Sequence, residues 1–220
     1  MQEVFLHILP LLLGAAISPV ATIGMIAVLT TKDSPKLKGF TYLVGAIIPL
    51  LLIGIPGIFL FANIQFKPAN SNVSSTIDLV AGLLLLALAV KNFFKKPSHQ
   101  LTKKAKSHKQ LSPAKSLALG TVLMITNFST IVLFLPAVKD IALSSLDDIE
   151  KMTVLLVSIP VVMSMIVLPL VIAVLLPNSS KSILERLRVF MTRHNRAIVQ
   201  AMLIIFGVYL LAKGFGIIAS

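Results

Sequence analysis

Cysteine is absent from the 220-residue chain, and acidic residues and histidines are few. Without cysteine the chain has no disulfide bonds, no thiol redox chemistry and no thiolate ligands for a metal or haem. The four histidines are too scattered in sequence to suggest a metal site, and no concentrated set of polar catalytic residues is visible. We therefore expect no metal, no cofactor and no enzymatic activity. The histidines are His7, His99, His108 and His194.

Charged residues are also scarce, at 13% of the chain, whereas 56% is hydrophobic. A soluble core of this size could not hide the long apolar runs that result, so the composition predicts an integral membrane protein. A spanning helix needs about 20 apolar residues. Six windows meet this requirement, and the third is the shortest. They cover residues 4–29, 40–62, 76–90, 116–138, 152–176 and 197–218.

The basic residues are distributed unevenly among the connections between these windows. Sixteen of the twenty lysines and arginines fall in the first, third and fifth connections. The positive-inside rule places these connections in the cytoplasm and both termini outside, in a multi-pass protein of the cell membrane. We therefore attribute the net charge of +12 to topology and contact with membrane lipid, and we expect no nucleic-acid partner. The remaining basic residues, expected outside with Asp140, Asp147, Asp148 and Glu150, are Lys67, Lys139, Lys151 and Lys213.

A short motif of the first window recurs in the fourth. ISPVATI at residues 17–23 is echoed by ITNFSTI at residues 125–131, with Pro19 matched by Asn127. Three spans per half would invert the second copy, as in many secondary transporters. The predicted fold is therefore all-α, with six transmembrane helices in two inverted three-helix repeats. Within one membrane domain, 1–220, the halves are 1–94 and 116–220, joined by a basic cytoplasmic linker, 95–115.

Proline interrupts the first two helices of the repeat. Pro19 lies in the first window, Pro49 and Pro56 in the second, and Pro160 and Pro169 in the fifth. Each proline removes one backbone hydrogen bond and leaves a carbonyl that needs another partner inside a membrane. We expect the first and second helices of each half to be broken, with the four prolines of the second helices acting as hinges.

The two echoed motifs carry neutral polar side chains at the same expected depth, and we expect them to approach each other and line a substrate site. The alternative is that small residues here only allow close helix packing. No charged residue is expected near the centre of a span. Asp78 is the candidate for proton or cation coupling, unless it is an interfacial residue that caps the third span. The candidate binding residues are Ser18, Pro19, Thr22, Thr126, Asn127, Ser129 and Thr130.

Several of these features resemble the lysine exporter superfamily. The resemblance rests on Ser18-Pro19, the basic loop running into GFTYLVG at residues 39–45, the long hydrophilic loop after the third span and the polar motif around Asn127. Within that superfamily the chain is most similar to the glycopeptidolipid- and sulfolipid-addressing (GAP/Sap) proteins. That similarity also includes AGLLLLALA at residues 81–89 and the ending at residues 206–214.

The resemblance implies six helices in two inverted halves, and export of small solutes or movement of lipid-linked molecules. The exporters' Pro-Gly-Pro is here Ser18-Pro19-Val20, and their Asn-Pro-Lys is Asn127-Phe128-Ser129. Loss of that lysine favours a less polar cargo. We therefore expect alternating-access transport of a small or lipid-linked, weakly charged substrate. The alternatives are a non-transporting scaffold or assembly factor for an envelope lipid pathway, and an amino-acid or cation exporter.

Two further expectations concern surfaces. Gly14, Ala15, Gly54 and Gly57 could support a homodimer through close helix packing. After the fifth span, Ile183, Leu187 and Phe190 recur at helical spacing, which predicts either a short interfacial helix or a plain connecting helix.

Overall fold

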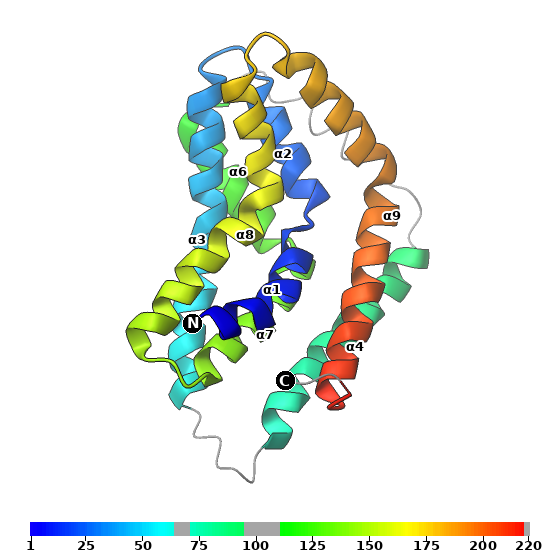
Figure 1. Cartoon of the computed structure of the whole chain (residues 1–220). Coiled ribbons are helices and arrows are strands. Elements are labelled where there is room, and N and C mark those ends of the chain that lie inside the picture. The colour runs from blue at the N-terminus through cyan, green and yellow to red at the C-terminus, as the bar shows by residue number, and fades with distance from the viewer. Residues whose placement is uncertain (64–70, 95–110, 218–220) are drawn as a thin grey trace.

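A computed structural model describes residues 1–63, 71–94 and 111–217, and in these ranges the chain is helical, without strands (Figure 1). Eight helices form the described structure. They are α1 (Gln2–Ala16), α2 (Pro19–Leu29), α3 (Pro35–Asn63), α4 (Ser71–Phe94), α6 (Pro113–Ile125), α7 (Phe128–Leu143), α8 (Asp148–Leu175) and α9 (Ser180–Gly214).

The predicted membrane fold is confirmed in its main outline. Four helices, α3, α4, α8 and α9, are long and apolar enough to cross a membrane. Two further pairs qualify only if each is one broken span: α1 with α2, bent by 59°, and α6 with α7, bent by 70°. The structure therefore holds four to six candidate spans, and both bends fall at the echoed motifs.

The prediction that the second helices are also broken is wrong. Pro49 and Pro56 lie inside the continuous α3, and Pro160 and Pro169 lie inside the continuous α8. A proline frees the carbonyl four residues earlier, and a helix can continue if a neighbour satisfies that carbonyl.

Hydroxyl groups from neighbouring helices satisfy two of the freed carbonyls. Thr121 of α6 donates to the Gly45 carbonyl, four residues before Pro49, at 2.9 Å. Thr22 of α2 donates to the Met165 carbonyl, four residues before Pro169, at 3.4 Å. Contacts between helices that are distant in sequence therefore compensate for Pro49 and Pro169.

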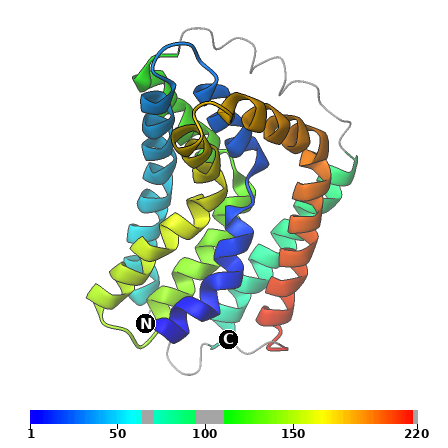
Figure 2. The same ribbon diagram turned by 45° about the horizontal axis from the view of Figure 1, so that its top comes forward.

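The helices are arranged as a main group with a long pair at its side. In Figures 1 and 2, α4 and α9 run side by side along one edge, and α2 and α7, one helix from each broken pair, lie between them and α3. Helices α3 and α6 approach closely because glycine stands at the contact. A Cβ on Gly45 would lie 2.1 Å from the Leu117 carbonyl oxygen, and one on Gly120 would lie 2.1 Å from that of Tyr42.

Helix α9 departs from the sequence prediction. The expected interfacial or connecting helix and the sixth span form one continuous helix, Ser180–Gly214. Its first part crosses one end of the bundle and its second part descends beside α4 (Figure 2). The predicted linker, 95–115, lies mostly outside the described residues, and its last three residues belong to α6.

The small residues considered for a homodimer are used within the chain. Added Cβ atoms on Gly14, Gly54 and Gly57 would meet Phe206, Leu155 and Val138, and Ala15 is fully buried. A homodimer stays a prediction, and it would have to use other surfaces.

Candidate substrate site at the crossing of the broken helices

The two breaks have similar local geometry. Ser18 caps α2 with ψ of 75°, and Asn127 caps α7 with ψ of 72°. The Ser18 carbonyl accepts from the amide of Thr22, and the Asn127 carbonyl accepts from the amide of Ile131. Asn127 is therefore the structural counterpart of Ser18, so the sequence match of Pro19 with Asn127 is out of register by one residue.

Asn127 joins the two broken pairs. Its Nδ2 donates to Ser18 Oγ at 2.5 Å and to Thr130 Oγ1 at 2.8 Å, and its Oδ1 accepts from Ser129 Oγ at 2.9 Å. Thr130 Oγ1 in turn donates to the Ala15 carbonyl at 2.8 Å, where α1 is ending. The expected approach of the two motifs is thus observed, and we refer to Ser18, Asn127, Ser129 and Thr130 as the crossing network.

Burial makes the crossing network a polar centre within an apolar bundle. Ser18 is 2% exposed and Thr130 is fully buried, while Asn127 and Ser129 are partly exposed. A buried polar group without a partner is costly, and here both amide hydrogens of Asn127 are used. The crossing is therefore closed by its own hydrogen bonds, and a ligand would have to exchange them for bonds to itself.

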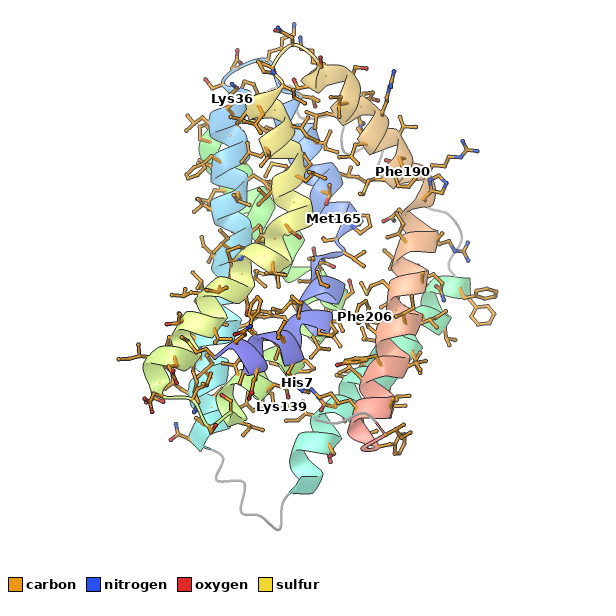
Figure 3. The ribbon with its side chains drawn as sticks, viewed as in Figure 1. His7, Lys36, Lys139, Met165, Phe190 and Phe206 are labelled. Carbon is orange, nitrogen blue, oxygen red and sulfur yellow. The ribbon has the colours of Figure 1, made fainter. Side chains whose placement is uncertain are left out.

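Thr22 and Pro19 lie beside the crossing network on α2. Both are buried, and Thr22 Oγ1 donates to the Ser18 carbonyl at 2.9 Å as well as to Met165 of α8, which is labelled in Figure 3. Pro19 is the first residue of α2, where a missing amide proton does no harm. Both residues therefore lie in the first turns of α2, next to Ser18, and Thr22 connects this end of α2 to α8.

Thr126 is the candidate that the structure does not bring into the crossing network. It is exposed, and its hydroxyl donates to the carbonyls of Val122 and Leu123 in its own helix. The sequence reasoning missed Thr121 and Tyr42. The hydroxyl of the buried Tyr42 donates to the Ala21 carbonyl at 2.7 Å and so ties α3 to α2. Only a knowledge of which helices pack together could have found these two contacts.

A second polar feature is a chain of buried ion pairs, which we call the charged cluster. Asp78 of α4 is 2% exposed and accepts from Lys139 Nζ at 2.6 Å, and Lys139 is fully buried. Lys139 Nζ also lies 3.3 Å from Asp140, which pairs with Lys213 of α9. The charged cluster therefore links α4, α7 and α9 through two acids and two bases (Figure 3 labels Lys139).

These positions correct two sequence expectations. Lys139 and Asp140 were expected with the outer connections, but α7 continues to Leu143 and holds both inside the bundle. Asp78 was considered as an interfacial cap, yet it is buried and paired. Its second oxygen, Oδ1, is buried and has no hydrogen-bond partner in the described structure. A coupling role for Asp78 stays a prediction.

The sequence held a signal for the charged cluster that hydropathy windows discard. Lys139 and Asp140 are followed by Ile141, Ala142 and Leu143, so the apolar pattern resumes after the charges. Within the described ranges, no group of three or more histidine, aspartate or glutamate residues is placed to hold a metal ion.

The sequence was compared with protein families, curated proteins and solved structures, and one family matches. A family model described as Sap, sulfolipid-1-addressing protein, matches residues 8–216. The chain belongs to this family. The match includes both breaks, the crossing network and the charged cluster. No curated protein matches the chain, and no solved structure matches it.

Proposed function

We propose that this member of the Sap family is a membrane transporter that moves a lipid-linked or small, weakly charged molecule by alternating access at the crossing network. The observation that carries the proposal is Asn127, which joins the broken ends of two helix pairs through one side chain. Broken helices that meet inside a bundle are a common way for transporters to build a substrate site. The description of the family, which refers to a sulfolipid, favours a lipid-linked cargo.

The pattern of helix contacts supports two inverted halves. We match α1 with α6, α2 with α7, α3 with α8 and α4 with α9. Under this exchange the α3–α6 contact corresponds to α8–α1, and α3–α7 corresponds to α8–α2. Likewise α4–α7 corresponds to α9–α2, and α4–α9 corresponds to itself. All of these pairs are in contact. We infer an inverted repeat, with both termini outside and the basic connections in the cytoplasm.

The chemistry of the crossing network favours a weakly charged group as cargo. It offers an amide, three hydroxyls and backbone groups at helix ends, and none of these carries a full charge. A buried anion or cation without a partner costs several kcal/mol, so a strongly charged group would be poorly held there. A sugar or another hydroxyl-rich headgroup could exchange hydrogen bonds with Asn127, Ser18 and Thr130.

Asp78 is the proposed coupling residue. It is the acid of the charged cluster that has an unpartnered oxygen, and it connects α4 to α7 next to the α4–α9 pair. Protonation of Asp78 would weaken its pair with Lys139 and so loosen α4 from α7. The same cluster also favours the second alternative, an amino-acid or cation exporter, because ion-driven carriers commonly use intramembrane carboxylates.

A scaffold or assembly factor for an envelope lipid pathway is the other alternative. It is favoured by the closed crossing network, in which the hydrogen-bonding groups satisfy one another. A scaffold gains nothing from breaking two spans at the same depth, whereas a transporter uses such breaks to change conformation. The two functions are separated by whether reconstituted protein moves a cargo.

The test uses purified protein in liposomes, with a fluorescent short-chain glycolipid and radiolabelled lysine as probes. We expect the wild-type protein to move the glycolipid and not the lysine. Asn127→Leu should slow the glycolipid about three- to twentyfold, because interhelical hydrogen bonds in membranes average about 0.6 kcal/mol and reach about 1.7 kcal/mol. Asn63→Leu is the matched control, since exposed Asn63 donates to the Phe59 carbonyl of its own helix and, among the described residues, to no other helix.

The outcomes separate the alternatives. Glycolipid movement no faster than in protein-free liposomes would contradict transport and favour the scaffold. Rapid lysine flux that Asn127→Leu leaves unchanged would show that both the site and the cargo class are wrong.

A further inference from the structure

The first part of α9, residues 180–196, has an exposed side that no part of the proposed mechanism uses. Leu184 and Met191 are buried against the bundle, and Leu187 is partly buried. Phe190 and Val189, by contrast, are 53% and 55% exposed. This segment crosses the end of the bundle where the second part of α9 turns down beside α4 (Figure 2). If α4 and the second part of α9 span a membrane, this segment is placed at the level of its polar headgroups.

Charge on this segment is strongly one-sided. It carries five basic residues and one acidic residue, Glu185. Arg188 pairs with Glu185 at 3.5 Å, and Arg196 donates to the Phe93 carbonyl. Arg186 and Arg193 have no hydrogen bond or ion pair with the part of the chain that the structure describes. Two exposed guanidinium groups are thus left without an anion.

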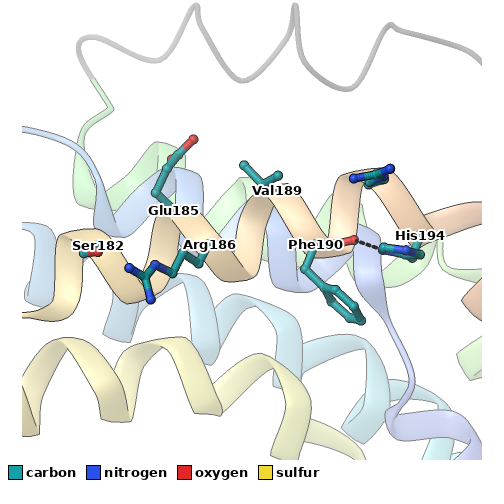
Figure 4. Close-up of a pocket in the computed structure, with 7 residues that line it drawn as sticks. Ser182, Glu185, Arg186, Val189, Phe190 and His194 are labelled. Carbon is teal, nitrogen blue, oxygen red and sulfur yellow. Dashed lines mark hydrogen bonds between the residues drawn. The ribbon is translucent and has the colours of Figure 1, made fainter.

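The two unpaired arginines share one side of the helix with Phe190. Positions seven apart are separated by two turns, so Arg186 and Arg193 lie almost in line, with Phe190 one turn after Arg186. In Figure 4, Arg186 and Phe190 extend toward one edge of this exposed face of α9, and Glu185 and Val189 extend toward its other edge. Together with Ser182 and His194, these residues line an open groove of about 550 Å³. The Phe190 ring is also close to that of His194, with centroids 4.7 Å apart.

We infer that Arg186 and Arg193 bind the headgroups of anionic lipids and that Phe190 inserts beside their acyl chains. Guanidinium groups bind phosphate through paired hydrogen bonds, and an aromatic ring beside basic residues is typical of helices that lie in the membrane interface. Charge complementarity alone fits either an anionic lipid or an acidic protein. The exposed Phe190 favours the lipid, because acyl chains next to the spans would remove its ring from water. The segment is cytoplasmic in the proposed topology, where anionic lipids attract basic residues.

This surface would also position the α4–α9 pair. The helix that carries Arg186 and Phe190 continues without a break to Lys213 in the charged cluster. Headgroups that hold the first part of α9 would therefore fix the tilt of its second part. The inference does not depend on whether the protein transports a cargo.

The chain contains no tryptophan, so Phe190→Trp introduces a single fluorescent reporter. The full-length variant is reconstituted into phosphatidylcholine vesicles, and separately into vesicles that also contain phosphatidylglycerol. We expect the emission to shift to the blue and quenching by brominated lipids to increase when the anionic lipid is present. Quenching by aqueous acrylamide should fall correspondingly, and added salt should reverse these changes.

The reporter is then combined with charge changes. Arg186→Gln with Arg193→Gln should abolish the dependence on phosphatidylglycerol. Lys181→Gln with Arg188→Gln removes the same charge from the same segment but not from the line of Phe190, and should preserve most of the dependence. Equal loss in both double variants would contradict the paired-arginine site.

The single Phe190→Trp protein decides the matter even if a double variant does not reconstitute. Emission and acrylamide quenching that are the same in both kinds of vesicle would overturn the inference.

Discussion

The crossing network and the charged cluster are both polar features of an apolar bundle, but they hold helices together by different means. The crossing network joins two broken helix pairs through neutral groups, each satisfied by a neighbour. The charged cluster joins the continuous helices α4 and α9 to α7, the second helix of one broken pair, through ion pairs. Neutral bonds of this kind are individually weak in membranes, whereas an unpaired buried charge is costly. In the proposed transport cycle, the crossing network is therefore the contact expected to open, and the charged cluster the contact expected to keep α4 and α9 beside α7.

Lys139→Met should have the largest effect. It leaves the buried Asp78 without its cation, while Asp140 keeps its pair with Lys213, and breaking a buried ion pair costs about 3–5 kcal/mol. We expect a marked loss of thermal stability in detergent, measured by unfolding with a fluorescent probe. Lys115→Met, at an exposed lysine near the start of α6, is the control and should change little. Equal stability of the two variants would mean that the charged cluster does not hold α4 against α7.

Asp78→Asn should have an intermediate effect. The amide keeps the shape of the carboxylate, and Lys139 retains Asp140 at 3.3 Å, so the loss should be about 1.5–3 kcal/mol for one hydrogen bond to a charged group. If Asp78 carries a coupling proton, this variant should also lose the pH dependence of glycolipid transport. A full pH response in the variant would exclude Asp78 as the coupling residue and leave its structural role intact.

The smallest effect is expected within the crossing network. A double-mutant cycle with Ser18→Ala and Asn127→Ala should give a coupling energy of about 0.6 kcal/mol, and at most about 1.7 kcal/mol. Unfolding of the four proteins under one set of conditions measures it. A coupling energy as large as the loss of stability in Lys139→Met would mean that the two regions hold their helices equally strongly. That result would favour a rigid scaffold.

The elements that local sequence governs could be predicted. The apolar windows, the break at Ser18-Pro19 and the break near Asn127 all follow from hydropathy and helix chemistry, and the structure contains both breaks and four to six candidate spans. The approach of the two motifs followed from their echo. The sequence could not predict that the helices continue through Pro49 and Pro169, because this depends on hydroxyls of Thr121 and Thr22 from distant helices.

The charged cluster was missed for a related reason. Hydropathy treats Lys139 and Asp140 as the end of a span, although paired charges can continue inside a bundle. Their partners, Asp78 and Lys213, are more than 60 residues away in sequence. The residues around Lys139 and Asp140 do not indicate that Asp78 of α4 and Lys213 of α9 lie beside them.

The most direct test of the central claim is access to the crossing network from the two sides of the membrane. The chain has no cysteine, so Ser129→Cys places one thiol beside Asn127, at a partly exposed position. Reconstituted protein is treated with a small membrane-impermeant thiol reagent, either added outside the liposomes or sealed within them. Protein inserted in one known orientation makes each treatment a probe of one side. Alternating access predicts that the thiol reacts from both sides, more slowly when the glycolipid probe is bound. A thiol that reacts from one side only, or from neither, would contradict the account.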